Sequence, residues 1–294
     1  ANSNAGTGKV RCLVNPMTGM EDEYCLTPAE KKKTVWVVGG GVSGCEAAIV
    51  AAKRGHQVTV FEKTAQLGGQ WIAAAVPMCK TEFTTLIVWQ QNRLAQLDVM
   101  VKYNCEVTAE MVVESAPDAV IIATGSNPVV PKIPGIDGAQ VVLAQDVLLG
   151  KVEAGRRVAV IGGGLVGAET ADFLACHGRQ VSIVEMMETL MRDGEPTPKA
   201  MLLKRLAQNH VDVYTSMKVT AIEADVVFGE KDGEEVRISD LDTVIIAIGV
   251  RSNKALEESL SETYHGEVVA VGDAKRAKNG YLGIQEGFEA GLHI

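Results

Sequence analysis

One glycine-rich segment occurs twice in this chain, and this duplication restricts the folds that the chain can adopt. The first copy, VWVVGGGVSGCEAAIVAAKRGHQVTVFEK, covers residues 35–63, and the second, VAVIGGGLVGAETADFLACHGRQVSIVEM, covers residues 158–186. Each copy has a continuous apolar run, then G-x-G-x-x-G, then an alanine-rich stretch of helical spacing and a second apolar run. Because continuous apolar runs are typical of strands buried on both faces, each copy predicts a β-α-β unit of a parallel sheet.

The three glycines of each motif have separate tasks in such a unit. The first permits a tight turn after the strand, the second lets a pyrophosphate approach the backbone, and the third lets the helix pack closely. Free N–H groups and the helix dipole then bind the phosphates at the helix N-terminus. The sequence therefore predicts two dinucleotide sites, one at Gly39, Gly41 and Gly44 and the other at Gly162, Gly164 and Gly167.

An acidic residue ends the second strand of each copy. Glu62 and Glu185 each follow the first glycine of their motif by 23 positions. A carboxylate at this place accepts hydrogen bonds from the ribose hydroxyls of a dinucleotide. Because a carboxylate repels a 2′-phosphate, and no basic residue follows Glu185 before Arg192, we expect the second site to prefer NADH over NADPH.

The duplication continues beyond the glycine-rich segments. The apolar run DAVIIATG, residues 118–125, matches DTVIIAIG, residues 242–249, with a shift of 124 positions. In open α/β sheets, ligands bind at the carboxyl ends of the strands. We therefore expect Thr124 and Gly125 to line the first site and Gly249 to line the second.

Two features accompany the first copy alone. One is LGGQW, residues 67–71, and the other is VVAVGDA, residues 268–274, which is followed by a helical stretch. A returning strand with Gly-Asp at its end would let Asp273 bind the ribityl chain of a flavin. The N-terminus of the following helix, near Gly280, would stabilise negative charge on a reduced flavin.

In combination, these motifs resemble the glutathione-reductase-like flavoprotein fold over residues 34–294. The resemblance implies an α/β protein with two Rossmann-like three-layer domains, in which the NAD(P)H domain is inserted into the FAD domain. It implies a leader at 1–33, an FAD domain at 34–149 and 266–294, and an NAD(H) domain at 150–265.

The same resemblance implies the residues that contact each cofactor. For FAD they are Gly39, Gly41, Gly44, Glu62, Lys63, Gly69, Gln70, Thr124, Gly125, Gly272 and Asp273. For the nicotinamide nucleotide they are Gly162, Gly164, Gly167, Glu185 and Gly249. The flavin itself carries the chemistry, so no side chain is nominated as catalytic. Disulfide reductases of this fold have two reactive cysteines close together, whereas Cys45 and Cys79 each stand alone, so disulfide reduction is not expected.

The opening of the chain resembles a narrower family. The leader RCLVNPMTGMEDEY has a Cys-x-x-Asn-Pro pattern, and KTEF at 80–83 follows LGGQW. Both fit the FAD/NAD(P)-binding C-terminal part of NADH:flavin oxidoreductases such as dienoyl-CoA reductase, 2-enoate reductase and trimethylamine dehydrogenase. Those enzymes also carry an FMN-binding barrel and four cysteines that hold a [4Fe–4S] cluster, and Cys12 matches the last of them. One thiolate cannot hold such a cluster, so FMN and [4Fe–4S] are expected only in a full-length parent. Cys12 is then either an orphaned ligand of a truncated chain, which we expect, or a plain loop cysteine.

The resemblance implies an FAD-dependent NAD(P)H oxidoreductase that passes a hydride from NADH to FAD. The electrons would go on to an acceptor or to the missing FMN/iron–sulfur module, which reduces an activated C=C bond. Two alternatives stay open. In an electron-relay protein of the trimethylamine dehydrogenase type, the second site would hold ADP. In a stand-alone ferredoxin or rubredoxin reductase the protein partner would be acidic, which the net charge of −9 disfavours.

Composition excludes other classes of partner. A net charge of −9 argues against nucleic acid, which is bound by basic surfaces. No apolar run approaches the roughly 18 residues that span a membrane. The six cysteines are scattered without a C-x-x-C pair, which favours free thiols in a cytoplasmic protein.

Overall fold

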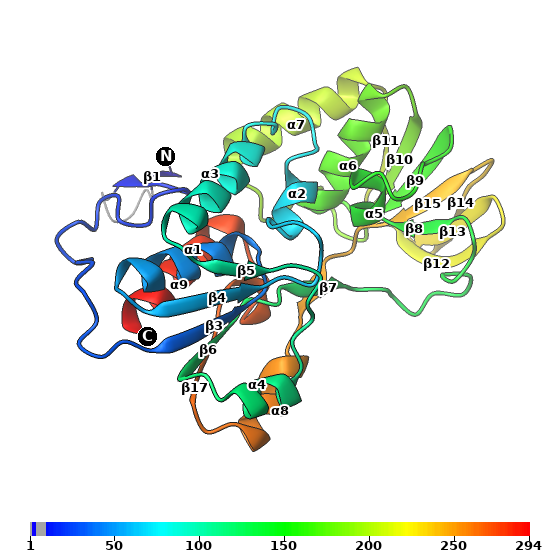
Figure 1. Cartoon of the computed structure of the whole chain (residues 1–294). Helices are drawn as coiled ribbons and strands as arrows, with labels where there is room; N and C mark the ends of the chain where they lie inside the picture. Colours follow the sequence, from blue (N-terminus) through cyan, green and yellow to red (C-terminus); the bar gives the residue numbers. More distant parts are fainter. Residues whose placement is uncertain (1, 4–9) are drawn as a thin grey trace. The chain divides into compact units, whose positions relative to one another are not determined.

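The chain folds into two compact units, each built on a parallel five-stranded sheet. The computed structural model describes residues 2–3 and 10–294. Unit 1 contains the described residues up to 72 together with 82–127 and 251–294, and unit 2 contains 73–81 and 128–250. The second unit is therefore inserted into the first, and the predicted fold class is confirmed (Figure 1).

The sheet of unit 1 has the strand order β17-β6-β3-β4-β5, and all its pairings are parallel. Its strands are β3 (Thr34–Val38), β4 (Gln57–Phe61), β5 (Met100–Lys102), β6 (Ala119–Ile122) and β17 (Glu267–Ala270). The apolar run of the first glycine-rich copy forms the central strand β3, in which Val35, Val37 and Val38 are buried. The glycine turn that follows β3 consequently lies at the carboxyl edge of the sheet, between β4 and β6.

Helices cover both faces of this sheet. On one face the core contains side chains of α1 (Val42–Lys53), α3 (Phe83–Gln96) and α9 (Gly280–His293), and on the other those of α4 (Ala109–Ser115) and α8 (Ala255–Thr263) (Figure 1). The short helix α2 (Gln70–Ala74) precedes α3, and a 3₁₀ turn, η1 (Gly272–Ala274), precedes α9.

Glycines allow α9 to approach α1 unusually closely. A Cβ at Gly287 would overlap the carbonyl oxygen of Ser43, and one at Gly291 would lie 2.6 Å from the carbonyl oxygen of Ala47. These two glycines are four residues apart and therefore lie on one face of the helix. The N-termini of both helices are thereby brought to the same edge of the sheet of unit 1.

The sheet of unit 2 has the strand order β11-β10-β9-β15-β8, again with parallel pairings. Its strands are β8 (Val141–Leu143), β9 (Arg157–Ile161), β10 (Gln180–Val184), β11 (Asp212–Tyr214) and β15 (Thr243–Ile246). One face packs on α5 (Ala144–Leu148), α6 (Leu165–Cys176) and α7 (Pro196–Gln208). The other packs on the antiparallel meander β12 (Lys218–Glu223), β13 (Val226–Lys231) and β14 (Glu234–Ile238).

The two compact units have borders of their own, while the domain borders at 149/150 and 265/266 stay a prediction. Residues 128–149 belong to unit 2 because β8 pairs with β15. Residues 251–265, which include α8, belong to unit 1. The chain passes between the units at 72/73, 81/82, 127/128 and 250/251, and the last two crossings lie within the paired short strands β7 (Ser126–Pro128) and β16 (Val250–Ser252).

The leader follows unit 1 where it is described. Besides the paired β1 (Asn2–Ser3) and β2 (Val10–Arg11), it contains Leu13, which packs on a small apolar cluster with Val42 and Ile284. The hydroxyl of Tyr24 donates a 2.8 Å hydrogen bond to Glu289 of α9. Within the described part of the chain, no helix has the length and apolar character needed to cross a lipid bilayer.

Candidate functional site

The first glycine motif forms a turn that only glycine permits. Gly39 follows β3 with a φ of +109°, and a Cβ there would overlap the carbonyl oxygen of Ala123. A Cβ at Gly44 would overlap the carbonyl oxygen of Gly39 itself. Since both obstacles are backbone atoms, the turn and the start of α1 depend on the absence of side chains.

The second motif repeats this geometry in unit 2. Gly162 follows β9 with a φ of +107°, and a Cβ there would lie 2.5 Å from the carbonyl oxygen of Ala247. A Cβ at Gly167 would overlap the carbonyl oxygen of Gly162. The two copies in the sequence are therefore two copies of one backbone arrangement.

The middle glycine of each motif faces open space. Gly41 and Gly164 are the N-cap residues of α1 and α6, and neither helix has a side-chain cap. No atom lies within 4 Å of a Cβ built on either residue. Each helix therefore presents uncapped N–H groups, at the positive end of its dipole, to a space that a side chain would fill. This is the arrangement that a phosphate requires, so both sites fit the pyrophosphate of a dinucleotide.

Glu62 is fixed beside the first motif. Its Oε2 accepts a hydrogen bond of 2.8 Å from the backbone N–H of Gly40. Its Oε1 accepts hydrogen bonds of 2.8 Å from both the backbone N–H and the hydroxyl of Thr64. The carboxylate is therefore held at the end of β4, with its orientation set by the turn that it borders.

Glu185 has the matching position in unit 2. Its Oε2 accepts a 2.6 Å hydrogen bond from the N–H of Gly163, and its Oε1 accepts one of 2.8 Å from the N–H of Met187. Methionine has no hydroxyl to add a third bond, and Glu185 is half-buried, whereas Glu62 is only 5% exposed. Gly249, with a φ of +108° and open space around its Cβ position, ends the neighbouring strand region.

Further predicted residues of the first site gather around the same turn. Gly69 has a φ of +53°, and a Cβ there would lie 3.2 Å from the Cα of Gly41. Gly272 has a φ of +59°, and its N–H donates a 2.8 Å hydrogen bond to Glu286. Lys63 is exposed directly after Glu62.

Two successive side-chain hydrogen bonds connect Gln70 to Asp273 through Ser126. Gln70 donates to Ser126, and the hydroxyl of Ser126 donates to Asp273. Gly125 lies beside it, with its Cβ position 3.5 Å from Nε2 of Gln70, while the hydroxyl of Thr124 donates to the carbonyl of Asn253. The sequence reasoning missed Ser126. A comparison of the two copies would have pointed to it, because the matching residue of the second copy is Val250.

Two glutamates at matching positions of α1 and α6 have different surroundings. Glu169 forms an ion pair with Lys80 inside unit 2. Glu46 is 5% exposed, and its Oε2 has no hydrogen-bond partner. Burial raises the pKa of Glu46 to about 7, although a hydrogen bond from Gln90 and the charge of Lys53 act in the opposite direction.

Cys45, the cysteine within the first glycine-rich copy, is not suited to redox chemistry. Cys45 is completely buried in α1, and burial, with the nearby charges of Glu62 and Glu46, raises the pKa of its thiol. It is therefore a thiol and not a reactive thiolate. Among the described residues, no three His, Cys, Asp or Glu side chains are grouped so that they could hold a metal ion. The role of Cys12 as a cluster ligand accordingly stays a prediction for a longer parent.

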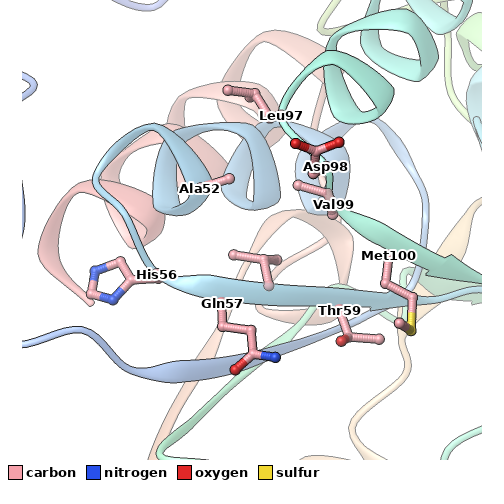
Figure 2. A pocket seen from close by; sticks show the side chains of 9 residues that line it. Ala52, His56, Gln57, Thr59, Leu97, Asp98, Val99 and Met100 are labelled. Atoms are coloured by element: carbon pink, nitrogen blue, oxygen red, sulfur yellow. The ribbon is translucent and has the colours of Figure 1, made fainter.

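A hollow of about 140 Å³ lies elsewhere in unit 1, around the start of β4. Figure 2 shows His56 and Gln57 at this amino end of the strand, with Asp98 and Met100 from the loop before β5 and from β5 itself. None of the predicted cofactor residues lines it. Because dinucleotides bind at the carboxyl ends of parallel strands, this hollow is not the site of either cofactor.

Comparison with known proteins agrees with this geometry. The family described as pyridine nucleotide-disulphide oxidoreductase matches residues 91–278, and the family of FAD-dependent oxidoreductases matches residues 34–97. Bilirubin reductase of Mediterraneibacter gnavus is 40% identical over 281 residues, which are 95% of this chain and 43% of that protein. Cinnamate reductase of Clostridium sporogenes is 38% identical over 97% of this chain and 43% of its own length.

A solved structure shows the same similarity. The structure of 2-naphthoyl-CoA reductase with 2-naphthoyl-CoA matches with a TM-score of 0.92 and 33% identity, over 97% of this chain and 43% of that one. The chain therefore spans about two fifths of the length of these relatives.

Proposed function

Because this chain belongs to the pyridine nucleotide-disulphide oxidoreductase family, we propose that it passes a hydride from NADH to FAD and sends the electrons onward. Unit 1 binds FAD in this proposal, and unit 2 binds NADH. The observation that carries it is the pair of open, uncapped helix N-termini at Gly41 and Gly164. Two such sites in one chain fit one dinucleotide each.

The assignment of FAD to unit 1 is supported by the residues that only this unit has. Gly69, Gln70 and Asp273 have no counterpart in the second copy, and they lie around the turn that begins α1. A flavin dinucleotide needs contacts beyond its adenosine and pyrophosphate. Side-chain acceptors and backbone groups of the residues around the turn of unit 1 are available for these additional contacts.

The residues of this chain bind and orient, while bound FAD supplies the capacity to accept a hydride and release electrons singly. The N–H groups at the start of α1 hold the pyrophosphate, and Glu62 accepts from a ribose hydroxyl. Asp273 accepts from the ribityl chain. The N-terminus of α9, capped by Asn279, would hold the flavin by its positive dipole end and would favour negative charge on it.

The destination of the electrons is proposed from the relatives. The proteins named above are reductases of bilirubin, cinnamate and 2-naphthoyl-CoA, so we infer that the parent of this chain reduces a conjugated organic substrate. In that parent, Cys12 would be one ligand of the [4Fe–4S] cluster that connects FAD to FMN. The matched segment is 43% of these relatives, and the remainder of such a parent would hold the substrate.

The direct test is an anaerobic titration of the purified, FAD-loaded chain with NADH, followed at the absorbance band of oxidised flavin. We expect stoichiometric bleaching by NADH and a much slower reaction with NADPH. If the flavin stays oxidised while ADP binds to the chain, the proposal fails, and the second site serves an electron-relay protein of the trimethylamine dehydrogenase type.

Glu185 is expected to set the preference for NADH. Glu185→Gln removes the charge that repels a 2′-phosphate but keeps the size of the side chain, so the ratio of NADH to NADPH efficiency should fall about tenfold. Rates of flavin reduction with each nucleotide measure this ratio. Glu188→Gln, an exposed position three residues later, is the matched control and should leave the ratio unchanged. Equal ratios in the original chain, Glu185→Gln and Glu188→Gln would show that Glu185 does not determine the preference for NADH.

A further inference from the structure

Ser126 lies at the centre of a polar chain that no motif of the sequence pointed to. It is the first residue of β7 and follows Gly125 at the carboxyl end of β6. The Nε2 atom of Gln70 lies 2.8 Å from its hydroxyl oxygen and 3.2 Å from its carbonyl oxygen. The hydroxyl of Ser126 also lies 3.2 Å from Oδ2 of Asp273. Ser126 thus joins two residues that are far apart in the sequence.

The donor and acceptor of each hydrogen bond among Gln70, Ser126 and Asp273 follow from the chemistry of these groups. A carboxylate only accepts, so the single proton of the Ser126 hydroxyl goes to Asp273. The hydroxyl must then accept from Gln70, and the carbonyl of Ser126 can only accept as well. Both contacts therefore require the nitrogen, and not the oxygen, of the Gln70 amide to face Ser126.

This orientation determines what Gln70 offers to a ligand. Its nitrogen is engaged by Ser126, so its oxygen lies on the opposite side of the amide and can only accept hydrogen bonds. Gln70 is exposed in unit 1, at the start of α2 and beside the turn at Gly125. The other oxygen of Asp273 is held by the N–H of Lys278 at 3.1 Å, which completes the fixed geometry of that carboxylate.

The second copy of the fold serves as an internal comparison. Its residue at the position of Ser126 is Val250, which has no hydroxyl, and no Gln70 accompanies it. The chain of hydrogen bonds is therefore not required by the β-α-β fold. It is a feature of unit 1 alone.

We propose that Ser126 is a positioning residue for the flavin: it turns the oxygen of Gln70 outward, where that oxygen accepts a hydrogen bond from a donor group of bound FAD. This inference rests on the proposed binding of FAD in unit 1. Flavin offers two kinds of donor, the N–H groups of the isoalloxazine ring and the hydroxyls of the ribityl chain. In Ser126→Ala the amide of Gln70 loses the 2.8 Å bond to the hydroxyl and keeps only the 3.2 Å bond to the backbone carbonyl of residue 126, so part of its population turns and presents nitrogen to a donor.

The test compares FAD affinity of the full chain in Ser126→Ala, Ser126→Thr and Gln70→Ala, after removal and re-addition of FAD. We expect Ser126→Ala to weaken FAD binding about tenfold, as for the loss of one well-formed hydrogen bond. Ser126→Thr keeps the hydroxyl and should stay within about threefold of the original chain. In a Gln70→Ala background, Ser126→Ala should add no further loss, because Ser126 acts through Gln70.

Three results would overturn the proposal. They are equal FAD affinity in all variants, an equal loss in Ser126→Ala and Ser126→Thr, and full additivity of Ser126→Ala with Gln70→Ala. The stability of the FAD-free chain is measured alongside, since a merely structural role would lower it in Ser126→Ala. An original chain that binds no FAD would instead overturn the proposed function, together with this inference.

The midpoint potential of the bound flavin then identifies the donor. A lower potential in Ser126→Ala than in the original chain, together with the weaker binding of oxidised FAD, would place the donor at a group whose hydrogen bond to Gln70 strengthens on reduction. An unchanged potential with weaker binding would place it at a group that donates in both states. Both results support the positioning role.

Discussion

Gly41→Ala is expected to leave the fold intact and to weaken FAD binding about 100-fold. The backbone of Gly41, with a φ of −70° and a ψ of 171°, is one that alanine adopts without strain. Nothing lies within 4 Å of the new Cβ, so the substitution meets no obstacle inside the protein. The methyl group would instead occupy the space through which the pyrophosphate approaches the N-terminus of α1. A displacement of a positioned ligand by about 1 Å can reduce its productive binding about 100-fold.

The measurement combines unfolding of the FAD-free chain with FAD titration. The free energy of unfolding should change by less than about 1 kcal/mol, because the substitution affects stability only through the weaker preference of alanine for the N-cap position. Gly164→Ala is the reciprocal control: it should keep FAD affinity and lose the nicotinamide nucleotide. In Gly44→Ala, by contrast, the new Cβ would overlap the backbone of Gly39, so this variant should lose stability by about 1–3 kcal/mol as well. If Gly41→Ala binds FAD normally, the pyrophosphate does not lie at α1.

The parts of the fold that the sequence predicted are those fixed by short-range constraints. The turns at Gly39 and Gly162 need a positive φ and a close backbone contact, and both requirements appear directly as glycines at set spacing. The apolar runs on either side then form parallel strands, because each is too apolar for a surface position. For the same reason the two-unit α/β architecture followed from the duplication.

The unit borders and the polar chain at Ser126 depend on contacts between distant residues. The strand β8 joins unit 2 because it pairs with β15, about 100 positions later, and nothing local in Val141–Leu143 shows this partner. Ser126 meets Gln70 across 56 positions and Asp273 across 147. A polar residue after a glycine is equally consistent with a solvated turn, so its role appears only when the strands are in place.

The burial of Glu46 is another feature that helical spacing did not reveal, and it leads to the second large effect. Glu46 lies in α1, packed toward α3, where Gln90 is itself almost completely buried. Burial raises the pKa of Glu46 from an ordinary value of 4.5 to about 7 in the folded chain. The folded chain therefore holds this proton more tightly than the unfolded chain. Stability should fall as the pH rises from about 4.5 to about 7 and should level off above that range.

Glu46→Gln is expected to remove this fall and to stabilise unit 1 by about 3–4 kcal/mol at pH 8, since one unit of pKa corresponds to about 1.4 kcal/mol. Near pH 4.5, where Glu46 is protonated in the fold, the variant and the original chain should differ by less than about 1 kcal/mol. All three tryptophans, Trp36, Trp71 and Trp89, lie in unit 1, so tryptophan fluorescence during urea unfolding reports on this unit alone.

The matched control for Glu46→Gln is Glu169→Gln, at the corresponding position of α6. Glu169 has a cationic partner in Lys80, so neutralising it removes an ion pair and should give no gain in stability at pH 8. Because Glu169 lies in unit 2, this substitution should also leave the tryptophan transition of unit 1 unchanged. Parallel curves of stability against pH for Glu46→Gln and the original chain would show that Glu46 is ionised throughout this range. In that case a second charge or a water molecule must compensate the carboxylate between α1 and α3.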